Sequence, residues 1–277
     1  MGGELVPALG IENISVFNLP PVEFVTLAAD LGVQHISTGL MSYGYNPHGY
    51  APYSLLEDAP LRREMIAAMR DRGVSISLGE GFTVRPGRVA GDYAATLDVM
   101  GELGVTRINS VSMDPDLNRT FDQFAALAEL AGARGFETTI ELSPNLTIGD
   151  LPTALAAVRH VARPDFKLLI DTMHLRRSGA AAADIAAVDP ALIGYVQICD
   201  APLEPRFESY FEEAMHERMA PGTGELGLLE LVAALPRDRV YALEVPLRTE
   251  AAAGLGPHER LGKCVEATRA LFAKLDS

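Results

Sequence analysis

The chain has 277 residues, of which 48% are hydrophobic, so it can bury a large core and is neither disordered nor fibrous. Its formal net charge of −14 argues against nucleic acids and anionic membranes as partners, because both repel a negative surface. The first residues lack the basic region followed by an apolar region that a signal peptide has, and no apolar run approaches the ~18 residues of a membrane span, so we expect neither feature. We therefore expect a cytoplasmic protein with a small-molecule substrate, compatible with homo-oligomer formation.

Eight short apolar segments have the near-continuous hydrophobicity of parallel strands that are buried on both faces. In chain order they are residues 7–11, 34–37, 74–78, 106–111, 137–142, 166–171, 194–199 and 240–245. Longer amphipathic stretches lie between them, and the four at residues 21–31, 61–72, 93–103 and 121–134 each stop at a glycine, the residue favoured at a helix C-cap. Eight strand–helix units in ~250 residues favour a closed barrel over an open, doubly wound sheet. We predict an α/β fold, a single (β/α)8 TIM barrel in one domain that spans residues 1–277.

Two connections, residues 38–58 and 201–224, are longer than the ~2–6 residues that usually join a strand to a helix. Both follow the carboxyl ends of strands, where a barrel keeps its active site, so we interpret them as lids or dimer contacts. The first contains half of the tyrosines, which either stack on a substrate or pack the loop: Tyr43, Tyr45, Tyr50 and Tyr53. The second contains residues that predict a short helix with an apolar face: Phe207, Tyr210, Phe211, Met215 and Met219.

The last four predicted strands all end in oxygen-bearing side chains. Glu141, Asp171, Gln197 and Glu244 come from four successive strands, and a barrel brings such ends to one mouth. A single acid at a strand end is often only the first solvated residue or a helix N-cap. Four in succession instead predict a site where oxygen ligands surround one divalent cation.

The same residues carry a resemblance to a known family. The chain resembles the xylose isomerase-like TIM barrel superfamily, in particular its sugar isomerase/epimerase and inosose dehydratase branch. The resemblance is sharpest over residues 137–246 and includes Asp171-x-x-His174 and the Pro-Gly-x-Gly loop at residues 221–224. It implies that Glu141, Asp171 and Glu244 are metal ligands. It also implies that His174 contacts a substrate hydroxyl group.

Gln197 departs from the family pattern, because many relatives have histidine there. An amide oxygen is a neutral, weaker donor, and its hardness favours Mn²⁺ or Mg²⁺ over Co²⁺ or Zn²⁺, which stay open as alternatives. The other interpretation is that Gln197 only donates hydrogen bonds and that the metal keeps three protein ligands. Asp200, three residues later, is a candidate for orienting a neighbouring side chain.

Glu141 and Glu244 are the predicted catalytic pair. In the mechanism that the resemblance implies, a hydroxyl and a carbonyl oxygen of the substrate chelate the metal, which stabilises an enediolate, while the two glutamates remove and return a proton. Three further residues are candidates for substrate binding. His35 is expected to end the second strand, Glu80 to follow the third, and Arg248 to pair with a carboxylate or bind a substrate anion.

The sequence therefore predicts a divalent-metal-dependent isomerase, epimerase or dehydratase of a sugar, keto-sugar or inositol derivative. A lyase that acts on a 3-keto-glycoside or another non-sugar carbonyl compound stays open as the alternative. An endonuclease of the three-metal type would need a basic groove and many histidines, whereas this chain is acidic and has 6 histidines. A binding protein with a decayed site is disfavoured because Glu141, Asp171, His174 and Glu244 are all present.

Overall fold

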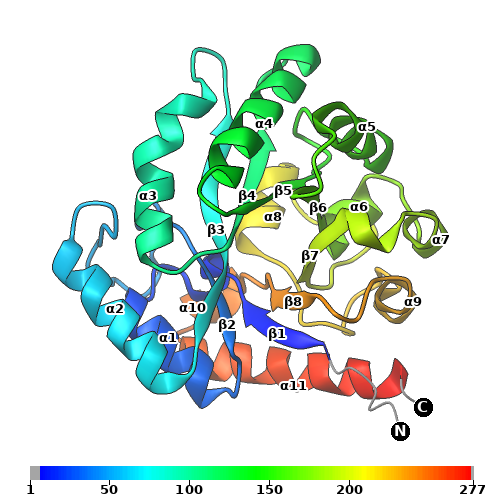
Figure 1. Ribbon diagram of the computed structural model, residues 1–277. Helices are drawn as coiled ribbons and strands as arrows, with labels where there is room; N and C mark the ends of the chain where they lie inside the picture. Colours follow the sequence, from blue (N-terminus) through cyan, green and yellow to red (C-terminus); the bar gives the residue numbers. More distant parts are fainter. Residues whose placement is uncertain (1–6, 276–277) are drawn as a thin grey trace, which may run out of the picture.

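The computed structural model describes residues 7–275 and closes eight parallel strands into a barrel in simple chain order, with β8 pairing with β1 (Figure 1). The strands are β1 (Ala8–Ile11), β2 (His35–Thr38), β3 (Ser75–Val84), β4 (Arg107–Ser112), β5 (Glu137–Glu141), β6 (Phe166–Asp171), β7 (Ile193–Ile198) and β8 (Val240–Leu243). The predicted (β/α)8 barrel is confirmed. Most strand bounds agree with the sequence to within two residues, but β3 runs six residues further than predicted.

Helices surround the ring of strands in Figure 1. They are α1 (Pro21–Asp30), α2 (Ala59–Arg72), α3 (Ala94–Glu102), α4 (Leu117–Gly132), α5 (Leu151–Val161), α6 (Thr172–Arg177), α7 (Ala182–Ala186), α8 (Tyr210–His216), α9 (Leu228–Ala233), α10 (Arg248–Ala252) and α11 (Pro257–Leu275). Short 3₁₀ turns are η1 (Asn13–Val16), η2 (Ala90–Tyr93) and η3 (Pro190–Leu192). Of the described helices, none is long and apolar enough to cross a membrane.

The four glycines that follow α1 to α4 all have the left-handed conformation that the sequence predicted. Their φ angles are 66° at Gly32, 69° at Gly73, 79° at Gly104 and 83° at Gly135. A residue with a Cβ is strained at such angles, so glycine ends each helix there and turns the chain into the next strand.

The interior of the barrel is filled by a small cluster of side chains, Leu78, Leu169, Tyr195 and Ala242, from four strands. Successive side chains of a strand point to opposite faces, so the residue two positions further on points inward again. On these four strands that residue is Glu80, Asp171, Gln197 or Glu244. An apolar layer therefore supports a polar layer directly above it, at the carboxyl end of the barrel.

The loop after β7 is fastened to the barrel by Asp200. One carboxylate oxygen of Asp200 accepts hydrogen bonds from the backbone N–H groups of Ala201 and Leu226, and the other accepts one from Gly222. The backbones of Asp200 and Met219 also pair as an antiparallel bridge. The sequence predicted that Asp200 orients a neighbouring side chain. In the structure Asp200 instead orients the backbone, because it holds the chain on both sides of the Pro-Gly-x-Gly loop.

Gly224 lies so close to Asp200 that a side chain does not fit. A Cβ on Gly224 would meet the side chain of Asp200 and lie 2.6 Å from the carbonyl oxygen of Ala201. We expect Gly224→Ala to lower the free energy of unfolding by about 1–3 kcal/mol, because backbone rather than a flexible side chain must give way. Chemical denaturation measures this. Gly256→Ala is the matched control, since a Cβ there meets nothing within 4 Å. Equal stabilities of the two variants would contradict the close packing.

Candidate active site

The strand register explains why the four predicted ligands meet. Asp171 pairs with Gln197 across β6 and β7, so these two side chains share one level and one face. Glu141 pairs with Leu169, two residues before Asp171, and therefore points to the same side of the sheet. Glu244 follows β8 two residues after Ala242, the partner of Gln197. All four side chains thus belong to the inner face at the mouth of the barrel.

Asp171, His174 and Glu141 form a compact group. One ligand atom from each lies within 4.8 Å of the others, which is close enough to hold a metal ion. Asp171 caps the N-terminus of α6 by accepting a hydrogen bond of 2.7 Å from the backbone N–H of His174. The imidazole Nε2 of His174 lies 3.3 Å from Glu141 Oε1, and its Nδ1 lies 2.5 Å from the hydroxyl of Tyr210. The Asp-x-x-His spacing therefore works through a helix cap that turns His174 back towards the site.

Arg218 is the residue that the sequence analysis missed. Its guanidinium is buried and makes ion pairs with two of the predicted ligands, 2.5 Å to Asp171 and 3.0 Å to Glu244. Its backbone N–H donates to the carbonyl oxygen of Pro246, just after β8. Arg218 lies in the loop that Asp200 holds to the end of β7. The pattern of polar residues at strand ends therefore could not predict it. The only signal in the sequence is its position shortly before the Pro-Gly-x-Gly loop.

The pKa values of the ion-paired groups move in opposite directions. Burial tends to raise the pKa of Asp171, but the charges of Arg218 and His174 outweigh it and hold this pKa well below its usual range. Burial raises the pKa of Glu244 well above its usual value; Arg218 opposes this shift, and the negative charges of Asp171 and Glu141 add to it. Neighbouring carboxyl groups in one site thus differ in their affinity for a proton, as acid/base chemistry requires.

The residues present fit a divalent cation. Gln197 is 1% exposed, yet neither its amide oxygen nor its amide nitrogen has a hydrogen-bond partner among the described residues. A buried amide without a partner is costly, and a cation beside its oxygen would remove that cost. The carboxyl groups of Glu141, Asp171 and Glu244 outnumber the one guanidinium of Arg218, so a cation beside them would reduce the electrostatic repulsion in the site.

Two further buried carboxyl groups lie on the other side of the same mouth. Glu80, predicted as a substrate contact, lines the cavity from within β3 rather than after it, at an irregularity in the pairing with β4. Glu12, just after β1, is 1% exposed, and the polar side chains beside its carboxyl group are Ser37, Tyr195 and Glu80. Burial raises the pKa of both groups, to about 7 for Glu12. Asn109 joins this side to the other by donating a 2.8 Å hydrogen bond to Glu141.

The structure places two predicted substrate contacts outside the lining of the cavity at the mouth. The expectation that His35 ends the second strand is wrong: it is the first residue of β2, and its ring bonds to Ser75 at the start of β3, at the opposite end of the barrel. Arg248 pairs with Glu212 at 2.9 Å and lies over the ring of Phe207, so it takes a carboxylate partner instead of lining the cavity. Partners that are distant in the sequence hold both side chains in these positions.

The mouth of the barrel holds a cavity of about 590 Å³. Its lining includes Glu12, Glu80, Glu141, His174, Arg218 and Glu244. Of the four tyrosines in the loop after β2, Tyr43 lines this cavity, and its hydroxyl donates to the carbonyl oxygen of Ile14. The predicted short helix with an apolar face is α8, which lies across the centre of the ring of strands in Figure 1.

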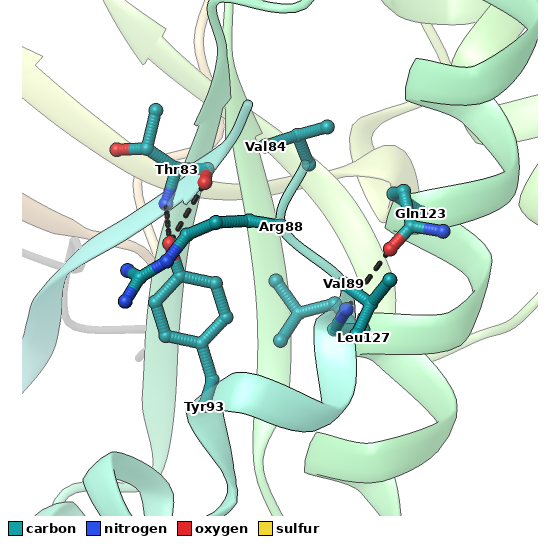
Figure 2. Close-up of a pocket in the computed structure, with 8 residues that line it drawn as sticks. Thr83, Val84, Arg88, Val89, Tyr93, Gln123 and Leu127 are labelled. Atoms are coloured by element: carbon teal, nitrogen blue, oxygen red, sulfur yellow. Dashed lines mark hydrogen bonds between the residues drawn. The ribbon is translucent and has the colours of Figure 1, made fainter. Parts of the chain in front are cut away.

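A second cavity, drawn in Figure 2, lies between β3 and α4 and has a volume of about 10 Å³. The Tyr93 hydroxyl bonds to the backbone of Thr83 there, and Gln123 accepts a hydrogen bond from Ala90. Such a space holds about one water molecule, so substrate chemistry belongs to the larger cavity.

The sequence matches the model of the xylose isomerase-like TIM barrel family over residues 25–264. The chain belongs to this family. No curated protein matches the sequence significantly. Family membership therefore agrees with the predicted resemblance and with the closed barrel.

Similar solved structures cover almost the whole chain at low identity. The protein IolI with a bound zinc atom is 16% identical, with a TM-score of 0.79 over 97% of this chain and 99% of that one. D-psicose 3-epimerase with D-tagatose, from Clostridium cellulolyticum H10, is 14% identical, with a TM-score of 0.70 over 96% and 99%. The probable 3-DHS dehydratase AsbF of Bacillus anthracis is 12% identical, with a TM-score of 0.70 over 98% and 99%. These likenesses show the fold.

Glu12 gives a pH-dependent prediction about stability. Burial raises its pKa from 4.5 to about 7, so between these pH values the folded protein keeps a proton that the unfolded chain has released. This contribution is complete below the lower value and is lost as the pH rises towards and through the upper one, so the free energy of unfolding falls between the two values, by up to about 3 kcal/mol in all. Urea denaturation between pH 5 and 8 should show a shallower fall for Glu12→Gln.

The exposed Glu57 provides the control, because Glu57→Gln should leave the pH dependence of the wild type unchanged. Parallel curves for the wild type and Glu12→Gln would mean that Glu12 is charged in the folded protein throughout this range.

Proposed function

We propose that this protein is a divalent-metal-dependent isomerase, epimerase or dehydratase that acts on a sugar, keto-sugar or inositol derivative by moving a proton at a carbon beside a carbonyl group. The observation that carries the proposal is the placement of Glu141 and Glu244, from β5 and from the end of β8, on the lining of one cavity with Asp171, Gln197 and Arg218 between them. Two carboxyl groups across one cavity are what removal and return of a proton require.

Each side chain has a role that its contacts support. Glu141 is oriented by Asn109 on one oxygen and by His174 on the other, which leaves it a fixed proton acceptor. Glu244 is held by Arg218 and lines the same cavity as Glu141, so it is placed to give a proton back. His174, itself held by Tyr210, can donate to or accept from a substrate oxygen. Arg218 supplies a positive charge beside its two ion-pair partners, Asp171 and Glu244.

Asp171, Gln197, Glu141 and Glu244 would hold the cation, and their oxygen-rich chemistry favours Mn²⁺ or Mg²⁺, with Co²⁺ and Zn²⁺ as alternatives. When bound, the ion would act as a Lewis acid that polarises a substrate carbonyl group. IolI, which contains zinc, and D-psicose 3-epimerase support this class of reaction as fold neighbours.

A second candidate is a lyase that acts on a 3-keto-glycoside or another non-sugar carbonyl compound. The same pair of glutamates would serve it, since elimination also begins with removal of a proton beside a carbonyl group. Apolar side chains such as Met113 and Phe211 on the lining of the cavity favour this candidate over an enzyme of small free sugars. Product analysis separates the two, because a lyase releases a leaving group and an isomerase does not.

The proton-transfer pair is tested by Glu141→Gln and Glu244→Gln. Each change keeps the shape of the side chain but removes its acid/base function, so turnover should fall roughly 10²-fold or more. Deuterium from the solvent should enter the product of the wild type and not that of the variants. Glu64→Gln, at an exposed position of α2, is the control and should leave both unchanged. An active substrate that takes up no deuterium would rule out this route.

The role of Gln197 is tested by Gln197→His, with metal content and the order of metal affinities as the readout. If the amide oxygen touches the ion, the imidazole nitrogen should shift the preference towards zinc and cobalt, while magnesium binding stays level or falls. The order is measured by competition among manganese, magnesium, cobalt and zinc for the chelator-treated protein. An unchanged order would remove Gln197 from the ligand set and leave Glu141, Asp171 and Glu244.

A further inference from the structure

The cavity at the mouth changes character from its floor to its rim. The floor carries the charged groups described above, whereas the wall is built from the apolar side chains Met41, Val111, Met113, Leu146, Phe211 and Met215. They come from four separate parts of the chain, namely the loop after β2, the end of β4 and the loop after it, the loop after β5, and α8. Because four distant segments each contribute apolar side chains to one wall, we interpret the apolar wall as a property that the site needs in order to bind its ligand.

Three of these side chains are left open to solvent. Met41 is 59% exposed, Met113 is 44% exposed and Phe211 is 53% exposed. A single exposed apolar residue is ordinary, but three on three segments that line one cavity expose apolar surface that water solvates poorly. An apolar ligand group would cover that surface, and the freed water makes its binding favourable.

The wall is held in place rather than flexible. Both the N–H and the carbonyl group of Tyr43, two residues after Met41, bond to the side chain of the buried Asn18. On the other side, Phe211 and Met215 lie four residues apart on α8, so they share one helix face. The opposite side of α8 is anchored by the buried Glu213, whose carboxylate pairs with Arg177. A preformed wall lowers the entropic cost of binding a ligand that fits it.

We propose that the substrate is amphipathic: an oxygenated sugar- or cyclitol-like end that binds at the charged floor, joined to an apolar group at least the size of one aromatic ring that lies against the wall. This inference rests on the proposed function for the floor and adds the class of compound. The volume agrees with it, because 590 Å³ falls within the ~300–1,000 Å³ of pockets that hold ligands of drug size. Methionine, with its flexible and polarisable side chain, suits contact with a ring.

Three hydroxamic acids of increasing size test the inference with a binding readout. Acetohydroxamate, benzohydroxamate and 2-naphthohydroxamate present the same pair of oxygens to a bound cation, and they differ only in the apolar group. Titration calorimetry with the Mn²⁺-loaded protein should show affinity that rises about tenfold or more from the methyl to the naphthyl compound, because each ring removes apolar surface from water.

The double variant Met113→Ser, Phe211→Ser should reduce this gain to less than about threefold while the affinity for acetohydroxamate stays the same. Leu229→Ser is the matched control, since Leu229 is an exposed apolar residue on α9 outside the cavity, and it should keep the full gain.

The outcomes separate the two proposals. Equal affinities for the three compounds in the wild type would overturn the amphipathic substrate and leave the metal-dependent function standing. Failure of all three to bind would overturn the metal site and this inference with it. A wild-type dimer that the double variant converts to a monomer in gel filtration would assign the exposed wall to a second copy of the chain, and would also overturn the inference.

Discussion

The ion pairs of Arg218 with Asp171 and Glu244 are the interaction on which the candidate site depends. Three carboxylates converge above an apolar layer, where water cannot screen their mutual repulsion. A guanidinium between two of them supplies a charge and a fixed set of donors, so the carboxylates can be buried without a large penalty. The carboxyl groups still outnumber this guanidinium, so the site favours a further positive charge.

This arrangement links parts of the chain that are far apart in sequence. Asp171 ends β6, Glu244 follows β8, and Arg218 is carried by a loop that Asp200 and Gly224 fasten to the end of β7. A defect in the packing of that loop would therefore reach the site through Arg218, although Gly224 itself touches no candidate ligand. Stability and function share these residues, so loss of activity alone does not make a loop residue catalytic.

The sequence predicted the features that follow from periodicity and from local backbone chemistry. Buried parallel strands are apolar throughout, and glycines with positive φ mark the ends of the early helices, so the barrel and most of its strand bounds were predictable. The inward direction of Glu141, Asp171 and Glu244 follows from their positions at strand ends. Gln197 remains a prediction as a ligand, with its unpartnered amide as support.

Long-range contacts explain what the sequence did not predict. His35 looked like a strand end because the apolar run around it is short, and only the pairing with β3 shows that it begins β2. Arg218 and Glu12 lie outside the strands, where periodicity gives no signal, and their roles depend on partners from other parts of the chain. Glu80 lies inside β3 because an irregularity in the pairing with β4 lengthens that strand.

The filled interior of the barrel limits the route by which a substrate can enter and a product can leave. Leu78, Leu169, Tyr195 and Ala242 close the space beneath the charged floor, so a compound cannot pass through the described barrel from end to end. A ligand of the cavity must therefore enter and leave through the rim at the carboxyl end of the barrel.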